Sequence, residues 1–181
     1  MKSRNKHHSM NVRAEILKEH SKKQTMKIVH FVGNDKKKFS GLMTLFLGNE
    51  YRITQRSAWA VSYCVKAFPS LILPYIEKMI RNTAKQNLHV AVKRNTVKIL
   101  EDIAIPEKFT GLCADMCFSL LASKTETLAV KVYSMSVLAK ICKKEPGLKN
   151  ELKLIVEEQL PYSTAGFRTR AKRVFSELEK I

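Results

Sequence analysis

The residues that could carry out chemistry are few in this 181-residue sequence, and they form no familiar catalytic or metal-binding motif. No HExxH, GxSxG or phosphate-loop glycine pattern occurs, and only six glycines are present to build one. Cys113 and Cys117 lie one helical turn apart in an apolar segment, without histidines at matching spacing. We therefore expect buried thiols, and we predict no catalytic residue, no metal site and no cofactor.

Positive charge is the most distinctive chemical feature. The chain has 33 Lys and Arg against 16 Asp and Glu, a net charge of +17. Residues 1–38 alone contribute 11 basic and 3 acidic side chains. Because such an excess attracts anionic surfaces, we expect an acidic protein or a nucleic acid as the partner.

The four cysteines indicate a reducing compartment, since all of them lie in apolar segments without disulfide or zinc spacing. The first ten residues lack the apolar core of a signal peptide, and the longest apolar run, residues 67–76, is interrupted by Pro69, Ser70 and Pro74. We predict a cytoplasmic location and no membrane partner.

A repeated pattern predicts the elements that position these charges. Segments starting at Thr54, Val92, Val130 and Phe167 align with offsets of 38, 38 and 37 residues. Small residues recur four positions later and apolar residues seven and eleven positions later, which is one face of an α-helix and does not match the period of a strand. The three columns are Ala58, Thr96, Ser134 and Ala171; Val61, Ile99, Val137 and Val174; and Val65, Ile103, Ile141 and Leu178.

Prolines 69, 106 and 146 mark a second helix in each period, because proline disfavours helix before it and suits the first turn after it. We predict one or two helices within residues 12–32, with Ser21 and Ser123 opening capping boxes, Asp35 capping a helix and Gly48 ending one. The predicted pairs are 35–47 with 50–67, 70–83 with 88–104, 107–122 with 125–143, and 147–160 with 163–179.

The segments VAVKRNTVKIL, LAVKVYSMSVL and GFRTRAKRVF resemble the second helices of HEAT and armadillo-like repeats. The resemblance covers residues 35–179. It implies an all-α fold, a right-handed α-solenoid (α-α superhelix) of about four helix pairs plus the N-terminal helix or helices. We expect residues 1–11 to be a flexible basic tail and residues 12–181 to be a single HEAT-like repeat domain.

The resemblance also implies a structural ladder, because the repeated basic position of such helices commonly bridges to the neighbouring repeat. A second interpretation, in which the ladder follows phosphates at regular steps, stays open. The ladder positions are Gln55, Lys93, Lys131 and Arg168. The candidates for a binding surface are Lys36, Lys37, Lys38, Arg52, Arg56, Arg94 and Lys98. We expect Trp59 to pack between repeats.

These features favour a non-catalytic scaffold that binds an acidic protein surface through a concave face and a basic N-terminal face. Sequence-independent nucleic-acid binding is the first alternative. A DNA glycosylase of the alkylation-repair type is a further one, because those enzymes are HEAT-like solenoids. Asp102 and Asp115 would then be its candidate aspartates.

Overall fold

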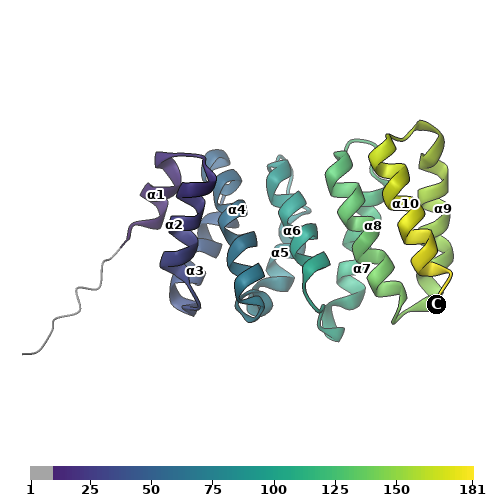
Figure 1. The fold of residues 1–181 in the computed structure, drawn as a ribbon, viewed down its shortest axis with the longest axis horizontal. Helices are drawn as coiled ribbons and strands as arrows, with labels where there is room; N and C mark the ends of the chain where they lie inside the picture. Colours follow the sequence, from purple (N-terminus) through teal and green to yellow (C-terminus); the bar gives the residue numbers. More distant parts are fainter. Residues whose placement is uncertain (1–9) are drawn as a thin grey trace, which may run out of the picture. The chain divides into compact units, whose positions relative to one another are not determined.

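The computed structural model describes residues 10–181, in which all regular structure is helical (Figure 1). Contacts divide the chain into two compact units, Met1–Leu71 and Ile72–Ile181. The predicted tail, residues 1–11, falls largely outside the described residues. Asn11 is described and caps the first helix, since its Oδ1 accepts from the Ala14 N–H at 3.0 Å. The single-domain expectation for residues 12–181 stays a prediction.

The first unit is built around α4 (Tyr51–Ala67), which packs against three shorter helices. These are α1 (Val12–Lys18), α2 (Lys22–Val32) and α3 (Lys36–Phe46). Phe39 and Phe46 of α3 and Val61 of α4 are fully buried at the centre. Trp59 lies edge-on to His20, at a ring-centroid distance of 5.8 Å, so it packs against the α1–α2 connection.

Side-chain caps begin α2 and α3 as predicted. The Asp35 carboxylate accepts from the N–H groups of Lys37 and Lys38 at 2.8 and 3.0 Å. Ser21 Oγ accepts from the Gln24 N–H at 3.1 Å, but the Gln24 side chain turns to Glu15 instead of back to Ser21. The first capping box is therefore only half formed.

Glu15 is a buried carboxylate that joins α1 to α2. It pairs with Lys18 and with Lys27 (2.8 Å), and it accepts from Gln24 Nε2 at 2.8 Å. Hydrogen bonds from Lys18, Lys27 and Gln24 lower its pKa from the ordinary 4.5 to about 2. Because the folded-state pKa is depressed, this stabilisation is present above pH 4.5 and is lost as the pH falls toward 2.

Glu15→Gln should therefore destabilise the first unit at pH 7 and flatten its pH dependence between pH 4.5 and 2. Trp59, the only tryptophan, reports unfolding of this unit by fluorescence during urea titration. Glu19→Gln, a change at an exposed position nearby, serves as the control. Identical pH profiles for Glu15→Gln and the parent chain would contradict this role.

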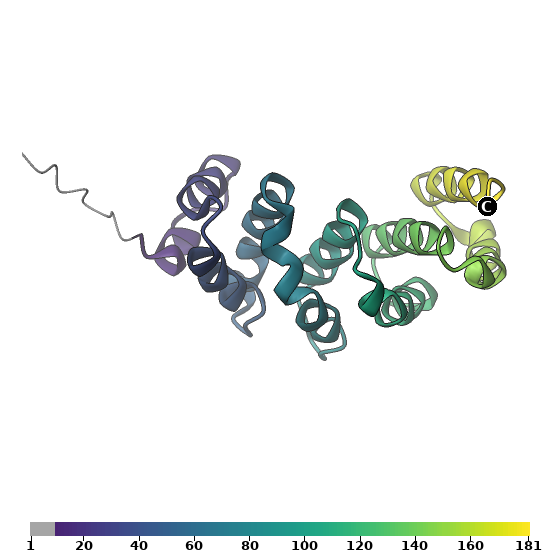
Figure 2. The same ribbon diagram turned by 90° about the horizontal axis from the view of Figure 1, so that it is seen from below.

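The second unit contains three helix pairs, each with a first and a second helix. The first helices are α5 (Ile76–Asn82), α7 (Thr110–Ala122) and α9 (Lys149–Gln159). The second helices are α6 (Val90–Asp102), α8 (Leu128–Cys142) and α10 (Ala165–Leu178). Figure 2 shows them as two layers, with α6, α8 and α10 in one and α5, α7 and α9 in the other.

Short 3₁₀ segments precede or follow the first helices. They are η1 (Pro69–Tyr75), η2 (Glu107–Phe109), η3 (Pro146–Leu148) and η4 (Leu160–Tyr162). The predicted helix 70–83 is α-helical only from Ile76, because Pro74 lies within it and has no N–H to donate. Pro69, Pro106 and Pro146 stand at the starts of η1, η2 and η3, where helix starts were predicted.

The capping box predicted at Ser123 is wrong. Ser123 ends α7, and its Oγ accepts from the Thr125 N–H at 3.2 Å. The following helix begins at Leu128, with Thr127 as its N-cap. The Glu126 side chain, which the predicted capping box required, forms a salt bridge with Lys93 on α6 instead. This salt bridge joins two repeats.

The small-residue column is buried in all four repeated helices. Ala58, Thr96, Ser134 and Ala171 are all 0 or 1% exposed. Within the described residues, the hydroxyl of Thr96 has no hydrogen-bond partner. A buried hydroxyl without a partner costs about 1–3 kcal/mol of folding stability. Thr96 therefore fills its place in the packed column with a hydroxyl that destabilises the fold.

Thr96→Val keeps the shape and removes the unpaired hydroxyl, so we expect it to raise the free energy of unfolding by about 1 kcal/mol. Thr83 is a matched control, because it is also buried but donates its hydroxyl to the Ile80 carbonyl at 2.7 Å. Thr83→Val should lower the free energy by about 1 kcal/mol. Urea denaturation followed by circular dichroism measures both, and the opposite order would refute the assignment.

Candidate partner-binding surface

One side of the second unit carries a band of charged side chains from three successive second helices, here called the second-helix face. It comprises Arg94, Lys98, Glu101 and Asp102 of α6; Tyr133, Ser136 and Lys140 of α8, with Lys143 at its end; and Arg170, Arg173 and Glu177 of α10. Six of these residues are basic and three are acidic. The face therefore carries a positive excess on a packed helical frame.

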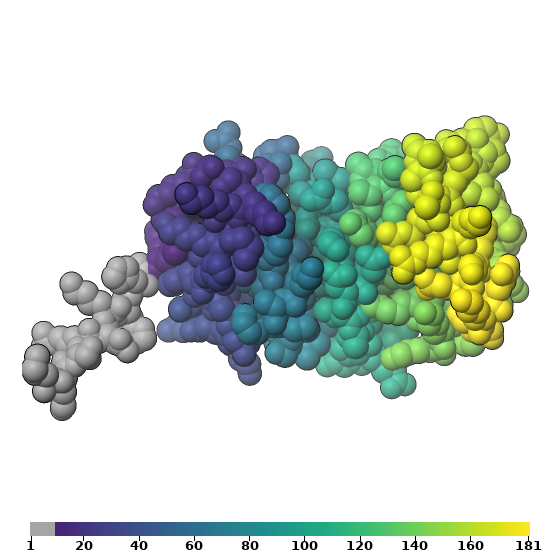
Figure 3. Space-filling view, viewed as in Figure 1, coloured from purple at the N-terminus to yellow at the C-terminus, as the bar shows by residue number. Residues whose placement is uncertain are grey.

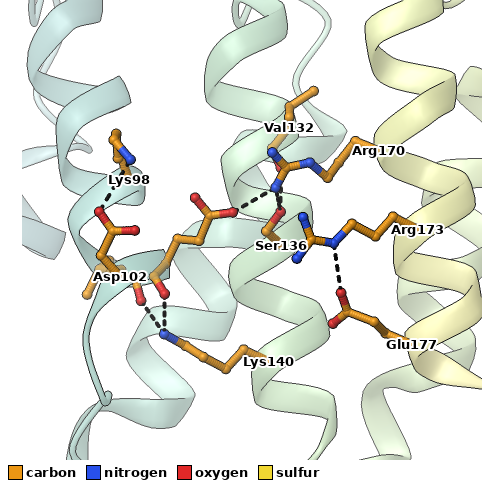
Figure 4. A network of polar contacts seen from close by, with 10 residues as sticks. Lys98, Asp102, Val132, Ser136, Lys140, Arg170, Arg173 and Glu177 are labelled. Atoms are coloured by element: carbon orange, nitrogen blue, oxygen red, sulfur yellow. Dashed lines mark hydrogen bonds and ion pairs between the residues drawn. The ribbon is translucent and has the colours of Figure 1, made fainter. Parts of the chain in front are cut away.

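A hydrogen-bonded bridge spans the face from α6 to α10 (Figure 4). Arg170 Nη1 lies 2.7 Å from Glu101 Oε1, although the two residues are 69 positions apart. The same nitrogen also donates to Ser136 Oγ on the intervening helix α8. Both charged side chains are about one quarter exposed, so this pair holds three helices in register.

Lys140 closes the C-terminal end of α6. Its Nζ donates to the carbonyl oxygens of Leu100, Glu101 and Ile103 at 2.6, 2.8 and 2.5 Å. Figure 4 shows part of this cap. These carbonyls belong to the last turn of α6 and to its C-cap Ile103, where no N–H of the same helix can reach them. Burial lowers the pKa of the Lys140 ammonium, while nearby acidic groups oppose that shift. Lys140 is thus a structural cap supplied by the next repeat.

Lys140→Met should lower the free energy of unfolding by about 2 kcal/mol or more, because buried carbonyls lose a charged donor. Lys144→Met is the control, since Lys144 is exposed just beyond the end of α8. Thermal and urea denaturation compare the two variants. Equal stability for the Lys140 and Lys144 variants would show that the cap contributes nothing.

The remaining cations of the face compete for few carboxylates. Glu177 accepts from Arg173 at 3.2 Å and from Lys143 at 3.4 Å. Lys98 lies 3.3 Å from Asp102, and its ammonium also stands 5.4 Å from the centre of the Tyr133 ring. A depression of about 170 Å³ opens beside Glu177 and is lined mainly by charged side chains. The cations at this rim remain available to a further anion.

The predicted binding residues are divided between the units. Arg94 and Lys98 lie on the second-helix face, Arg94 being exposed. The others belong to the first unit. Lys36, Lys37 and Lys38 begin α3, whereas Arg52 and Arg56 lie in the first half of α4.

The first-unit candidates do not form one patch. Since α3 and α4 form an antiparallel pair, the length of α3, about 16 Å, separates the two groups. Lys38 donates to the Phe31 carbonyl at 3.1 Å, and Arg56 donates to the carbonyls of Ile16 and Leu17 at 3.2 and 3.0 Å. Both cations hold helix ends, and Lys36, Lys37 and Arg52 stay exposed.

Two ladder positions reach the next repeat. Lys93 pairs with Glu126, and Lys131 Nζ donates to Gln159 Oε1 at 2.7 Å. Arg168 donates instead to the Ser163 carbonyl in the loop before its own helix. Gln55, the departure from the basic pattern, is half-buried on α4.

Lys140, Arg170 and Arg173 belong to the face but are not among the residues predicted from the sequence. The repeat register contains the signal, because Lys98, Ser136 and Arg173 occupy equivalent positions, as do Asp102, Lys140 and Glu177. Opposite charges at one register position, one repeat apart, indicate side chains near each other on adjacent second helices. The acceptors of Lys140, however, are backbone carbonyls and carry no sequence signal.

The thiols and aspartates are not gathered into a site. Cys113 and Cys117 are fully buried and free, and burial is the main cause that raises the pKa of Cys117. Asp102 pairs with Lys98 on the second-helix face, while Asp115 lies on α7 in the other layer. The two candidate aspartates of a glycosylase are therefore separated by the thickness of a helix layer.

Comparison with known proteins gives the family. A model of the HEAT repeat domain matches residues 12–178. The chain belongs to the HEAT repeat family. The predicted all-α fold of paired helices is thereby confirmed for this HEAT repeat protein. No curated protein and no solved structure matches the chain. Among residues 10–181 of the HEAT repeat protein, no helix combines the length and apolarity needed to cross a membrane.

Proposed function

We propose that this HEAT repeat protein is a non-catalytic scaffold whose second-helix face binds an acidic segment of a protein partner. HEAT repeats form helical scaffolds that often serve protein interaction. The observation that carries the proposal is the surplus of exposed cations on this face. Arg173 and Lys143 are 72% and 54% exposed and share the single carboxylate of Glu177.

A protein partner fits the face better than a nucleic acid. Glu101, Asp102 and Glu177 are interleaved with the cations and would repel a continuous phosphate backbone. Tyr133 is the only aromatic side chain of the defined face, and the Lys98 ammonium already stands over its ring. Stacking of successive bases needs several open rings. A cytoplasmic location, in keeping with the free thiols, is part of the proposal.

The test reverses three cations of the face, Arg94→Glu, Lys98→Glu and Arg173→Glu, in one chain. We expect at least about a tenfold weaker affinity for a fluorescent 20-residue polyglutamate probe at 0.1 M salt, because close charge pairs govern such binding. Fluorescence anisotropy measures the affinity. Circular dichroism checks that the triple variant remains folded.

A matched control carries the same charge change in the first unit, namely Lys22→Glu, Lys23→Glu and Lys36→Glu. These lysines are exposed on α2 and α3. Loss of binding in this control alone would place the site on the first unit. If labelled single-stranded or duplex DNA binds more tightly than polyglutamate, with a steep salt dependence, the partner of this face is a nucleic acid and not a protein.

A further inference from the structure

In the second unit, α6 and α8 each carry a stripe of residues that faces the next helix pair. On α8 the stripe is Lys131, Met135, Leu138 and Cys142, and the last three are 0% exposed. This stripe faces α9 of the next helix pair, because the Lys131 ammonium donates to Gln159 of α9. The equivalent stripe of α6 begins at Lys93, which pairs with Glu126 ahead of α8.

The same stripe recurs on α10 as Arg168, Lys172, Phe175 and Glu179, here called the end face. Among the described helices, α10 packs against α8 and α9, and no other described helix covers its remaining surface (Figure 3). Lys172 and Glu179 are exposed, and Phe175 is only half-buried. A depression of about 330 Å³ lies here, and Leu160 adds to its apolar lining.

The end face keeps the features that bind a neighbouring helix pair. Phe175 is apolar like Leu138 and Leu100, which are fully buried at the equivalent positions. Arg168 keeps the ladder cation but bonds the Ser163 carbonyl of its own loop. Polar Lys172 replaces the buried Met135 and allows the face to meet water. An apolar centre with a charged rim is typical of a reversible interface.

We propose that the end face docks an amphipathic helix of a partner protein, which places an acidic side chain against Arg168 and an apolar one against Phe175. Glu126 and Gln159 set the precedent, because each gives a side-chain oxygen to the ladder cation of the preceding repeat. Arg168 and Lys172 favour an acidic helix. Two copies of the end face would instead bring these cations together in a self-complementary contact. This surface is separate from the second-helix face.

The test uses a helix-constrained peptide of residues 146–162 with Gln159→Glu. This segment contains α9, whose Gln159 accepts from Lys131, and Lys131 is the ladder cation one repeat before Arg168. The peptide is titrated into the full chain and followed by fluorescence anisotropy. We expect saturable binding at least tenfold tighter than that of a scrambled peptide of the same composition. Equal affinity for the two peptides would overturn the proposal.

Charge reversal locates the site. Lys172→Glu should weaken peptide binding at least fivefold, whereas Lys144→Glu, at an exposed position beyond the end of α8 and outside both faces, should change it less than twofold. Arg168→Glu should bind poorly to the Gln159→Glu peptide and recover affinity for a peptide that carries Gln159→Lys instead. Loss of binding with Lys144→Glu alone would place the peptide elsewhere and overturn the proposal. Sedimentation of the parent chain as a dimer that Phe175→Ser dissociates would assign the face to a second copy and also overturn it.

Discussion

Helix ends that receive their donors from the next repeat are the constraint on which the structure rests. Lys140 reaches three carbonyls at the end of α6, and Gln159 Nε2 reaches the Leu121 carbonyl near the end of α7 at 3.1 Å. Arg56 does the same for the last turn of α1. Each bond joins residues 37 to 40 positions apart. Since repeats contact only their neighbours, such bonds fix how adjacent helix pairs align.

The same constraint divides the cations of this basic chain into two kinds. Cations whose position in the period faces a helix end or a neighbouring carboxylate are structural, as Lys140 and Lys93 show. Cations at other positions, such as Arg94 and Arg173, are exposed and add to the surface potential. Position within the repeat, and not the net charge of +17, therefore determines which side chains can meet a partner.

The sequence predicts the helix pairs closely, because apolar periodicity and the prolines report directly on burial and backbone geometry. It predicts η1 poorly, since the effect of Pro74 on the preceding turn depends on local hydrogen bonding. The site is harder to predict. Lys36 begins α3 and Arg52 lies in the first turn of α4, so these two residues lie at opposite ends of the antiparallel pair although they are near in sequence. Glu101 and Arg170 are far apart in sequence and bonded. Charge patterns alone do not encode these distances.

The spacing of the bonds between repeats also limits how a chain of this kind can change in length. Adding or deleting one residue within α7 would rotate the following part of the helix by about 100° and displace Lys140 from the carbonyls of α6. Adding one complete helix pair would repeat the same geometry and supply a new donor for the preceding helix end. Viable length variants should therefore differ by whole helix pairs, with smaller insertions confined to the connecting loops.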